Sequence, residues 1–110
     1  RFLAVGSTER EIQVWDLEKG EQIHSLRGHV AGIRGLAFSP DGRTLATCGD
    51  QRLKLWNVET GSELMVLAHD VVEIGSPRFS PDGRTLVAHA RDKWLRIWRV
   101  PSFEGGAINQ

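Results

Sequence analysis

The sequence predicts an all-β fold built from a repeated unit of four short strands, and two observations carry this prediction. The segment Phe38–Leu45 reads Phe-Ser-Pro-Asp-Gly-Arg-Thr-Leu and returns 41 residues later as Phe79–Leu86. Tryptophan keeps nearly the same spacing, at Trp15, Trp56 and Trp98. Self-similarity at a fixed period of about 20–50 residues indicates a repeat architecture, in which each unit packs against its neighbours.

Each copy of the repeated segment contains Ser-Pro-Asp-Gly, at 39–42 and 80–83, which is turn chemistry. Proline presets φ at the first corner, aspartate suits the next position, and glycine takes the left-handed position. Such a turn between two apolar runs is typical of a β-hairpin loop. We therefore expect one strand from Ile33 to Phe38 and a second from Thr44 to Cys48.

A third strand is expected at Leu53–Asn57, with counterparts at Ile12–Asp16 and Leu95–Arg99. In each counterpart, aliphatic residues alternate with a polar residue and the tryptophan, so the two groups occupy opposite faces of the strand. Because both faces carry a large apolar group, such a strand requires packing on both sides, as in stacked sheets.

A weaker fourth strand is expected at Glu21–Leu26 and again at Glu63–Leu67, each after a short turn that ends in glycine. The first unit begins inside its second strand, at Phe2–Val5. No segment predicts a helix, and residues 101–107 are expected to form a linker or a frayed end.

With these elements in order, the chain resembles the WD-repeat (tryptophan–aspartate repeat) β-propeller family over residues 2 to about 100. Trp15-Asp16 is a literal Trp-Asp pair, Trp56-Asn57 is a variant of it, and Gly28-His29 matches the family's Gly-His element. The resemblance implies four-stranded antiparallel blades of a β-propeller, here about two and a half blades of an incomplete ring.

The resemblance divides the chain into a partial blade at 1–29 (strands b, c and d), a complete blade at 30–70 (strands a–d) and a last blade at 71–110 (strands a–c) with a C-terminal tail. Many members close the ring with an outer strand from the N-terminus, so an end after a third strand implies the C-terminal blades of a larger propeller. A ring needs about 4–8 blades. We therefore expect the remaining blades of the same propeller, or other copies of the chain, to complete it.

In this family a buried network of His, Ser/Thr, Asp and Trp often fastens a blade. Carried over by position, the middle blade has the full set, whereas the last blade has Ala88 in place of the hydroxyl. The first blade keeps only Trp15, with Val5 and Glu9 at other positions, so these two blades are expected to be less tightly fixed. The expected structural network consists of His29, Thr47, Asp50, Trp56, His69, Asp92 and Trp98.

His29, Thr47 and Asp50 are also the residue types of a hydroxyl–histidine–carboxylate triad, which would make the chain a hydrolase. We expect the structural network instead, and no enzymatic activity. The four histidines, His24, His29, His69 and His89, lack the close spacing of metal ligands. Neither the dinucleotide-binding nor the P-loop pattern is present, so we expect no metal and no cofactor.

Fourteen basic and fourteen acidic side chains cancel, so the basic excess typical of nucleic-acid binding is absent. No apolar run reaches the roughly 18 residues that span a bilayer. No secretory signal is visible, and the single cysteine, Cys48, fits a reducing compartment. We therefore expect a cytoplasmic protein with neither nucleic acid nor membrane as a partner.

The resemblance implies a non-catalytic protein–protein interaction scaffold that binds other proteins or peptides. The alternative is a regulatory or sensor region of a bacterial multidomain Ser/Thr kinase, whose kinase domain would precede the propeller. In similar propellers, partners dock on the loop before the first strand and on the turn between strands two and three. There we expect Arg34, Glu73 and Arg91 to bind partners, and Trp94 either to pack on the next blade or to form a binding hot spot.

Overall fold

Within the residues that the computed structural model describes, every regular element is a β-strand, which confirms the all-β prediction. These residues are 1–6, 11–29, 32–49, 52–68, 74–90, 95–104 and 107–109. The strands are β1 (Phe2–Gly6), β2 (Glu11–Asp16), β3 (Glu21–Arg27), β4 (Gly35–Phe38), β5 (Thr44–Gly49), β6 (Arg52–Asn57), β7 (Glu63–Ala68), β8 (Ile74–Phe79), β9 (Thr85–Ala90), β10 (Leu95–Arg99), β11 (Ser102–Glu104) and β12 (Ala107–Asn109).

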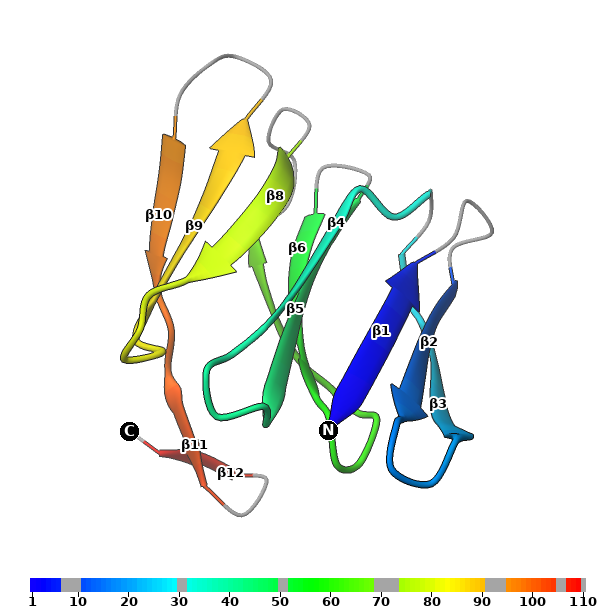
Figure 1. The fold of residues 1–110 in the computed structure, drawn as a ribbon. Helices are drawn as coiled ribbons and strands as arrows, with labels where there is room; N and C mark the ends of the chain where they lie inside the picture. The colour runs from blue at the N-terminus through cyan, green and yellow to red at the C-terminus, as the bar shows by residue number, and fades with distance from the viewer. Residues whose placement is uncertain are drawn as a thin grey trace.

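Three antiparallel sheets stand side by side, with their faces turned toward one another (Figure 1). The first has the order β1-β2-β3, the second β4-β5-β6-β7, and the third β10-β9-β8. The leading strand β4 of the central sheet lies beside both β1 and β8. The arrangement is an open stack of blade-like sheets, in agreement with part of a propeller and not with a closed ring.

The repeated Ser-Pro-Asp-Gly segment forms the same hairpin loop twice. In the first copy the Asp41 carboxylate accepts hydrogen bonds from the Ser39 hydroxyl at 2.6 Å and from the Arg43 backbone N–H at 3.0 Å. Gly42 has a φ of 74°, in the left-handed region where glycine is favoured over other residues. The second copy repeats these contacts at Ser80, Asp82, Gly83 and Arg84.

The predicted strands are present, with bounds that differ by at most two residues. The largest difference is at β4, which begins at Gly35, whereas the sequence predicted Ile33. Backbone pairing nevertheless continues to Arg34, whose N–H donates to the Cys48 carbonyl at 2.8 Å. Such differences lie within the usual fraying of strand ends.

The C-terminal tail differs from the expectation of a linker or frayed end. β11 and β12 pair as a two-stranded antiparallel sheet, with Phe103 opposite Ile108. The sequence signal was the dipeptide Gly105-Gly106 between two short apolar segments, which is a hairpin signal. Phe103 stands where the earlier units have the turn residues Gly20 and Gly61. This difference in turn chemistry accounts for the third sheet's having no fourth strand after β10 among the described residues.

Each stacked sheet has two unlike faces, which are set by the alternation of residues along β2, β6 or β10. We call the face with Ile12 and Val14, or its equivalents in the other sheets, the aliphatic face, and the opposite one, with the tryptophan, the indole face. The equivalents are Leu53 and Leu55 in the central sheet, and Leu95 and Ile97 in the third; the tryptophans are Trp15, Trp56 and Trp98.

Two hydrophobic cores fill the spaces between the sheets, and in both an aliphatic face packs on an indole face. The first core joins the aliphatic face of β2 to the indole face of the central sheet; it contains Ile12, Val14, Leu26, Leu45, Trp56 and Val58. The second joins the aliphatic face of β6 to the indole face of the third sheet; it contains Ala46, Cys48, Leu53, Leu55, Leu86, Ala88 and Val100. The central strand β6 is therefore covered on both sides, as the sequence predicted.

Candidate functional site

A chain of buried hydrogen bonds joins three of the residues that the family resemblance singled out. The indole N–H of Trp56, on β6, donates to the hydroxyl of Thr47, on β5, at 2.8 Å. The same hydroxyl lies 2.6 Å from Nε2 of His29, which precedes β4 in the chain. All three side chains are buried, and Thr47 is fully so. The contacts tie the Gly-His element to the middle two strands of the central sheet.

The donor and acceptor roles in this row of hydrogen bonds depend on the tautomer of His29. A threonine hydroxyl has one proton to donate and lone pairs that can accept. Since Thr47 accepts the indole N–H, its own proton is available to Nε2 of His29 in the tautomer in which that nitrogen carries no proton. Each of the two contacts then has one donor and one acceptor, as the burial of polar groups requires.

The other members of the predicted network lie outside the described residues. These are Asp50 of the middle blade and His69 and Asp92 of the last blade. The partner-binding candidates Glu73 and Arg91, and the extra tryptophan Trp94, also lie outside them.

The two remaining tryptophans sit in different polar surroundings. The indole N–H of Trp15 donates to the side-chain oxygen of Gln13 at 3.2 Å, within its own strand. Trp98 is on β10, which pairs with β9. The residue of β9 equivalent to Thr47 is Ala88, which has no hydroxyl to accept a hydrogen bond. Only the central sheet, among the described parts, therefore has an indole bound to a threonine.

An ion pair between a buried lysine and an exposed glutamate lies next to the network, and sequence reasoning missed it. Nζ of Lys54 is 2.9 Å from a carboxylate oxygen of Glu63 and donates to the Gly28 carbonyl at 2.8 Å. The Lys54 side chain is 8% exposed, and its charge lies 5.8 Å from the centre of the Trp56 ring. The available signal was a lysine between two leucines on a strand that was expected to be covered on both faces. A charge buried in this way needs a partner, so the pattern indicates an ion pair.

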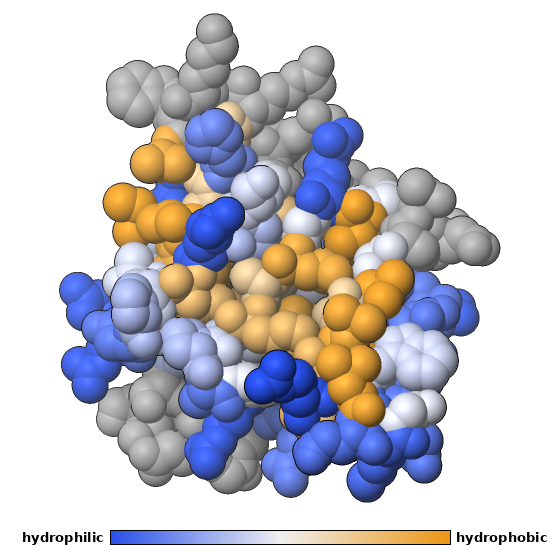
Figure 2. All heavy atoms as spheres, in the orientation of Figure 1, coloured by the Kyte–Doolittle hydropathy of each residue, from blue (hydrophilic) through white to orange (hydrophobic). Residues whose placement is uncertain are grey.

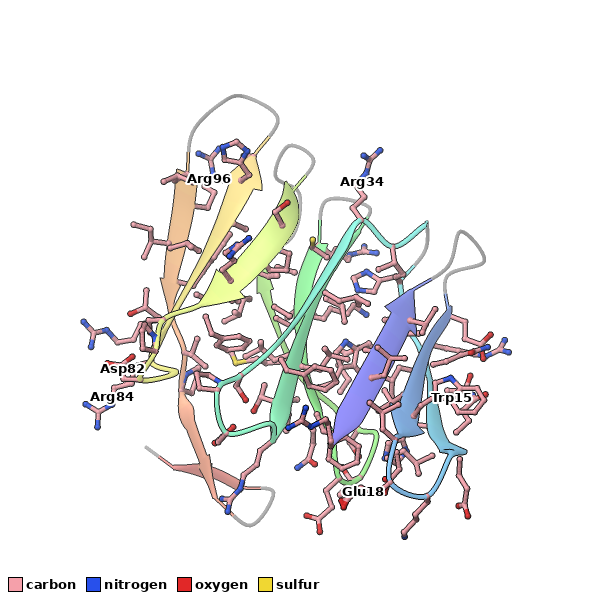
Figure 3. The ribbon with its side chains drawn as sticks, in the orientation of Figure 1. Trp15, Glu18, Arg34, Asp82, Arg84 and Arg96 are labelled. Atoms are coloured by element: carbon pink, nitrogen blue, oxygen red, sulfur yellow. The ribbon has the colours of Figure 1, made fainter. Side chains whose placement is uncertain are left out.

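Arg34 is the partner-binding candidate that the structure describes, and its side chain is exposed. Figure 3 shows it extending beyond the sheets, at the end of β4 that lies opposite the Ser-Pro-Asp-Gly turns. A hollow of about 550 Å³ lies between β4 and β8, and Arg34, Leu36, Pro77 and Arg78 contribute to its wall. Sequence reasoning missed Arg78. The available signal was a difference between the repeats, since the equivalent residue in the preceding copy is Ala37.

The turn end of the stack has a larger hollow, of about 1270 Å³, between the hairpin loops. Asp41 and Asp82 contribute to its wall, and each carboxylate has a lowered pKa. The hydroxyl of Ser39 or Ser80 is the main cause, followed by the backbone N–H of the arginine two residues later. Both aspartates are therefore engaged in shaping the turns.

Within the described residues, no group of three or more His, Cys, Asp or Glu side chains is placed to hold a metal ion. Burial raises the pKa of the Cys48 thiol to about 11, which is the opposite of the shift that activates a nucleophilic cysteine. No helix in this part of the chain has the length and apolar character to cross a membrane.

Comparison with known proteins supports the resemblance. The family described as "WD domain, G-beta repeat" matches residues 20–57 and 61–99. The nuclear distribution protein PAC1 of Mycosarcoma maydis is 44% identical over 45 residues, which are 41% of this chain and 10% of that protein. Coronin-7 of Bos taurus is 48% identical over 52 residues, 46% of this chain and 6% of the relative.

A lissencephaly-1 homolog of Caenorhabditis briggsae is 41% identical over 49 residues, 44% of this chain and 13% of that protein. Each match thus spans a small part of the relative's length. The family match covers most of the chain, and the sheets follow the same repeat. The chain belongs to the WD-repeat family.

Proposed function

We propose that the chain is part of a non-catalytic protein–protein interaction scaffold and that it binds a protein or peptide at the Arg34 end of the sheets. The observation that carries this proposal is the hollow between β4 and β8, which has exposed arginines at Arg34 and Arg78. Arginine can bind a carboxylate with two hydrogen bonds and is enriched at interface hot spots. The partner would therefore present acidic side chains or a C-terminal carboxylate to Arg34 and Arg78, while Glu73 and Arg91 stay predicted contacts that lie outside the described residues.

The burial of the hydroxyl and imidazole supports a non-catalytic role. A nucleophile has to reach its substrate, and Thr47 is fully buried while His29 is 4% exposed. Their hydrogen bonds tie the segment before β4 to β5 and β6, and the burial of both side chains leaves a substrate no access to them. A structural role for this group is consistent with the family's use as an interaction scaffold.

Affinity capture with the wild-type chain and its variants tests the proposal. The variant Arg34→Glu reverses the charge at the proposed surface and should lose the proteins that the wild-type chain retains. The matched control is Arg84→Glu, because Figure 3 places Arg84 at the opposite end of the sheets. A partner recovered in this way should then bind the purified Arg34→Glu chain at least about tenfold more weakly, a loss of ~1.4 kcal/mol.

Retention of the same proteins by wild type and Arg34→Glu would exclude this surface. Equal losses in Arg34→Glu and Arg84→Glu would show a general effect of net charge. The kinase-linked alternative, the cytoplasmic location and the exclusion of nucleic acid and membrane stay predictions, since no contact among the described residues bears on them.

A further inference from the structure

The segment Ser76-Pro77-Arg78 departs from the repeat at three successive positions. The residues 41 positions earlier are Gly35-Leu36-Ala37, and the same segment Phe-Ser-Pro-Asp-Gly-Arg-Thr-Leu follows both triplets. β4, which contains the first triplet, pairs with β5 without a shift of register. A Gly-Leu-Ala triplet is therefore sufficient for a strand at this place, and the strand itself does not require Ser-Pro-Arg.

The changed triplet forms a bulge in β8. Gly75 is opposite His89 and Arg78 is opposite Val87, so β8 has one residue more than β9 between these two pairs. Ser76 has a φ of 52°, in the left-handed region that residues other than glycine rarely adopt. Bulges of this kind redirect a side chain, and strained backbone is concentrated at functional sites.

Pro77 and Gly35 hold the bulge in place. The Pro77 side chain is buried, whereas Ser76 is exposed. A Cβ atom at Gly35 would lie 2.6 Å from Cδ of Pro77 and 2.9 Å from the backbone nitrogen of Ser76. These separations are too short for a side chain, so glycine is what allows β4 and β8 to approach this closely. The close contact fixes Pro77 and leaves the neighbouring serine at the surface.

The Ser76 hydroxyl has no hydrogen-bond partner within the described part of the chain. The other serines whose side chains are described each form a hydrogen bond with a nearby side chain: Ser25 with Glu11, Ser39 with Asp41, Ser62 with Thr60 and Ser80 with Asp82. A serine hydroxyl has one proton to donate. The bulge therefore presents a donor that the fold itself does not use.

The hollow into which this donor opens is positively charged. Ser76 lines it together with Arg34 and Arg78, and none of the described residues in its wall is acidic. The larger hollow at the turn end differs, because basic and acidic residues alternate in its wall; the acidic ones are Asp16, Asp41, Glu59 and Asp82. The smaller hollow therefore favours an anion. It lies between β4 and β8, both of which belong to this chain, so its charge does not depend on any further sheet.

We propose that Arg34, Ser76 and Arg78 bind a phosphorylated serine or threonine side chain of a protein partner. A phosphate monoester carries a charge of about −1.5 to −2 at neutral pH and has three acceptor oxygens. It therefore matches two arginines and a hydroxyl. A carboxylate has a single charge and about four lone-pair sites, which two guanidinium groups fill without the hydroxyl. This inference rests on the proposed function and names the acidic group that the partner presents.

Apolar side chains complete the wall of the hollow, namely Leu36, Phe38, Pro77 and Phe79. Figure 2 shows apolar atoms at the surface across the middle of the view, where Figure 1 places β4. Residues beside the phosphorylated one would pack on this apolar surface. A phosphopeptide should therefore bind more tightly than inorganic phosphate.

Peptide binding to the full-length protein tests the proposal. A resin-bound peptide library with a fixed central phosphoserine selects a sequence, which is then synthesised with phosphoserine, glutamate or serine at that position. Fluorescence anisotropy should show the phosphoserine form binding at least about tenfold more tightly than the glutamate form, because of its greater charge and its additional acceptor oxygen. Inorganic phosphate should displace the peptide at high concentration.

Substitution by the residues of the preceding repeat provides variants that preserve the strand. Arg78→Ala and Ser76→Gly introduce the residues found at positions 37 and 35, and glycine accepts the left-handed φ at position 76. Each variant should bind the phosphoserine peptide at least about tenfold more weakly. Arg84→Ala is the matched control, because Arg84 lies at the opposite end of the sheets (Figure 3), and it should bind as the wild type does.

Three results would overturn the proposal. The first is a phosphoserine library from which no peptide is enriched above the serine library. The second is equal affinity for the phosphoserine and glutamate forms of the selected peptide. The third is wild-type affinity for the phosphoserine form in both Arg78→Ala and Ser76→Gly.

Phosphatase treatment of the cell extract before affinity capture separates this proposal from the proposed function. Partners that are still retained after the treatment, but are lost with Arg34→Glu, would exclude the phosphate and leave the binding of acidic partners intact. Partners that are retained equally by wild type and Arg34→Glu would exclude both.

Discussion

The hydroxyl of Thr47 accepts the indole N–H of Trp56 at 2.8 Å although the two residues are not directly opposite in the sheet. The residue opposite Thr47 is Lys54, and the one opposite Trp56 is Leu45. The indole therefore reaches diagonally across β5 and β6, a span that aromatic side chains can bridge. In the same place the hydroxyl meets His29, so one atom connects three segments of the central sheet.

Replacing Thr47 by valine should lower the free energy of unfolding by about 1–3 kcal/mol, because the buried indole N–H and imidazole nitrogen lose their partner. Valine has nearly the same shape, so the loss would come from the hydroxyl and not from a cavity. Urea unfolding followed by tryptophan fluorescence measures it. Thr47→Ser keeps the hydroxyl and should recover most of the stability; equal stability of Thr47→Val and wild type would contradict the role of this bond.

Replacing Lys54 by methionine should also destabilise the chain, by about 1–3 kcal/mol, since it leaves the Gly28 carbonyl and the Glu63 carboxylate without their donor. The comparison is Arg27→Met, because Arg27 is 78% exposed and lies 4.0 Å from Glu11. Such a surface pair contributes about 0–1 kcal/mol. Thermal unfolding of both variants is the measurement. Equal destabilisation by Lys54→Met and Arg27→Met would contradict the prediction.

The Ser-Pro-Asp-Gly turn should make stability sensitive to acid. The Ser39 hydroxyl holds the pKa of the Asp41 carboxyl below its ordinary value of 3.8, and the Arg43 N–H adds to the effect. A carboxyl with a lowered folded-state pKa stabilises the fold above its unfolded-state pKa, and that contribution is lost as the pH falls through the folded-state value.

Asp41→Asn keeps a hydrogen-bond acceptor but has no charge, so its stability should fall less than that of the wild type as the pH drops below 3.8. Urea midpoints measured over a pH series give both slopes. Identical slopes for Asp41→Asn and wild type would show that this carboxyl does not contribute to the acid sensitivity.

The Cys48 thiol should react slowly with an aromatic disulfide reagent at neutral pH while the chain is folded. Burial raises its pKa to about 11, so little thiolate exists, and its sulfur lies in the core between the second and third sheets. Reaction in urea should be complete and fast, which provides the internal control. A folded chain that reacts at the rate of the unfolded one would mean that this core opens readily.

Much of the fold followed from local patterns in the sequence. The Ser-Pro-Asp-Gly turns, with Gly42 and Gly83 in the left-handed region, and the alternation of Leu53, Leu55 and Trp56 predicted the strands of each unit. The hairpin of β11 and β12 was not predicted, because it lies beyond the last copy of the repeat and its local signal is a single pair of glycines, Gly105-Gly106.

The candidate site was predictable in part. The family pattern placed His29, Thr47 and Trp56 together, and the structure joins them by hydrogen bonds. The pattern contained nothing about Lys54, because its partners Gly28 and Glu63 come from other segments of the chain. A contact between distant segments has no local periodicity by which it could be recognised.

The local sequence specifies the strands, their turns and which residues share a face, because turn chemistry and the two-residue alternation act within a few positions. It does not specify which faces are covered. Leu55 and Ile97 occupy equivalent positions, yet the first is fully buried and the second is 67% exposed. The difference depends on whether another sheet stands beside the strand, and burial of apolar surface is therefore a property of the assembled stack and not of the repeat.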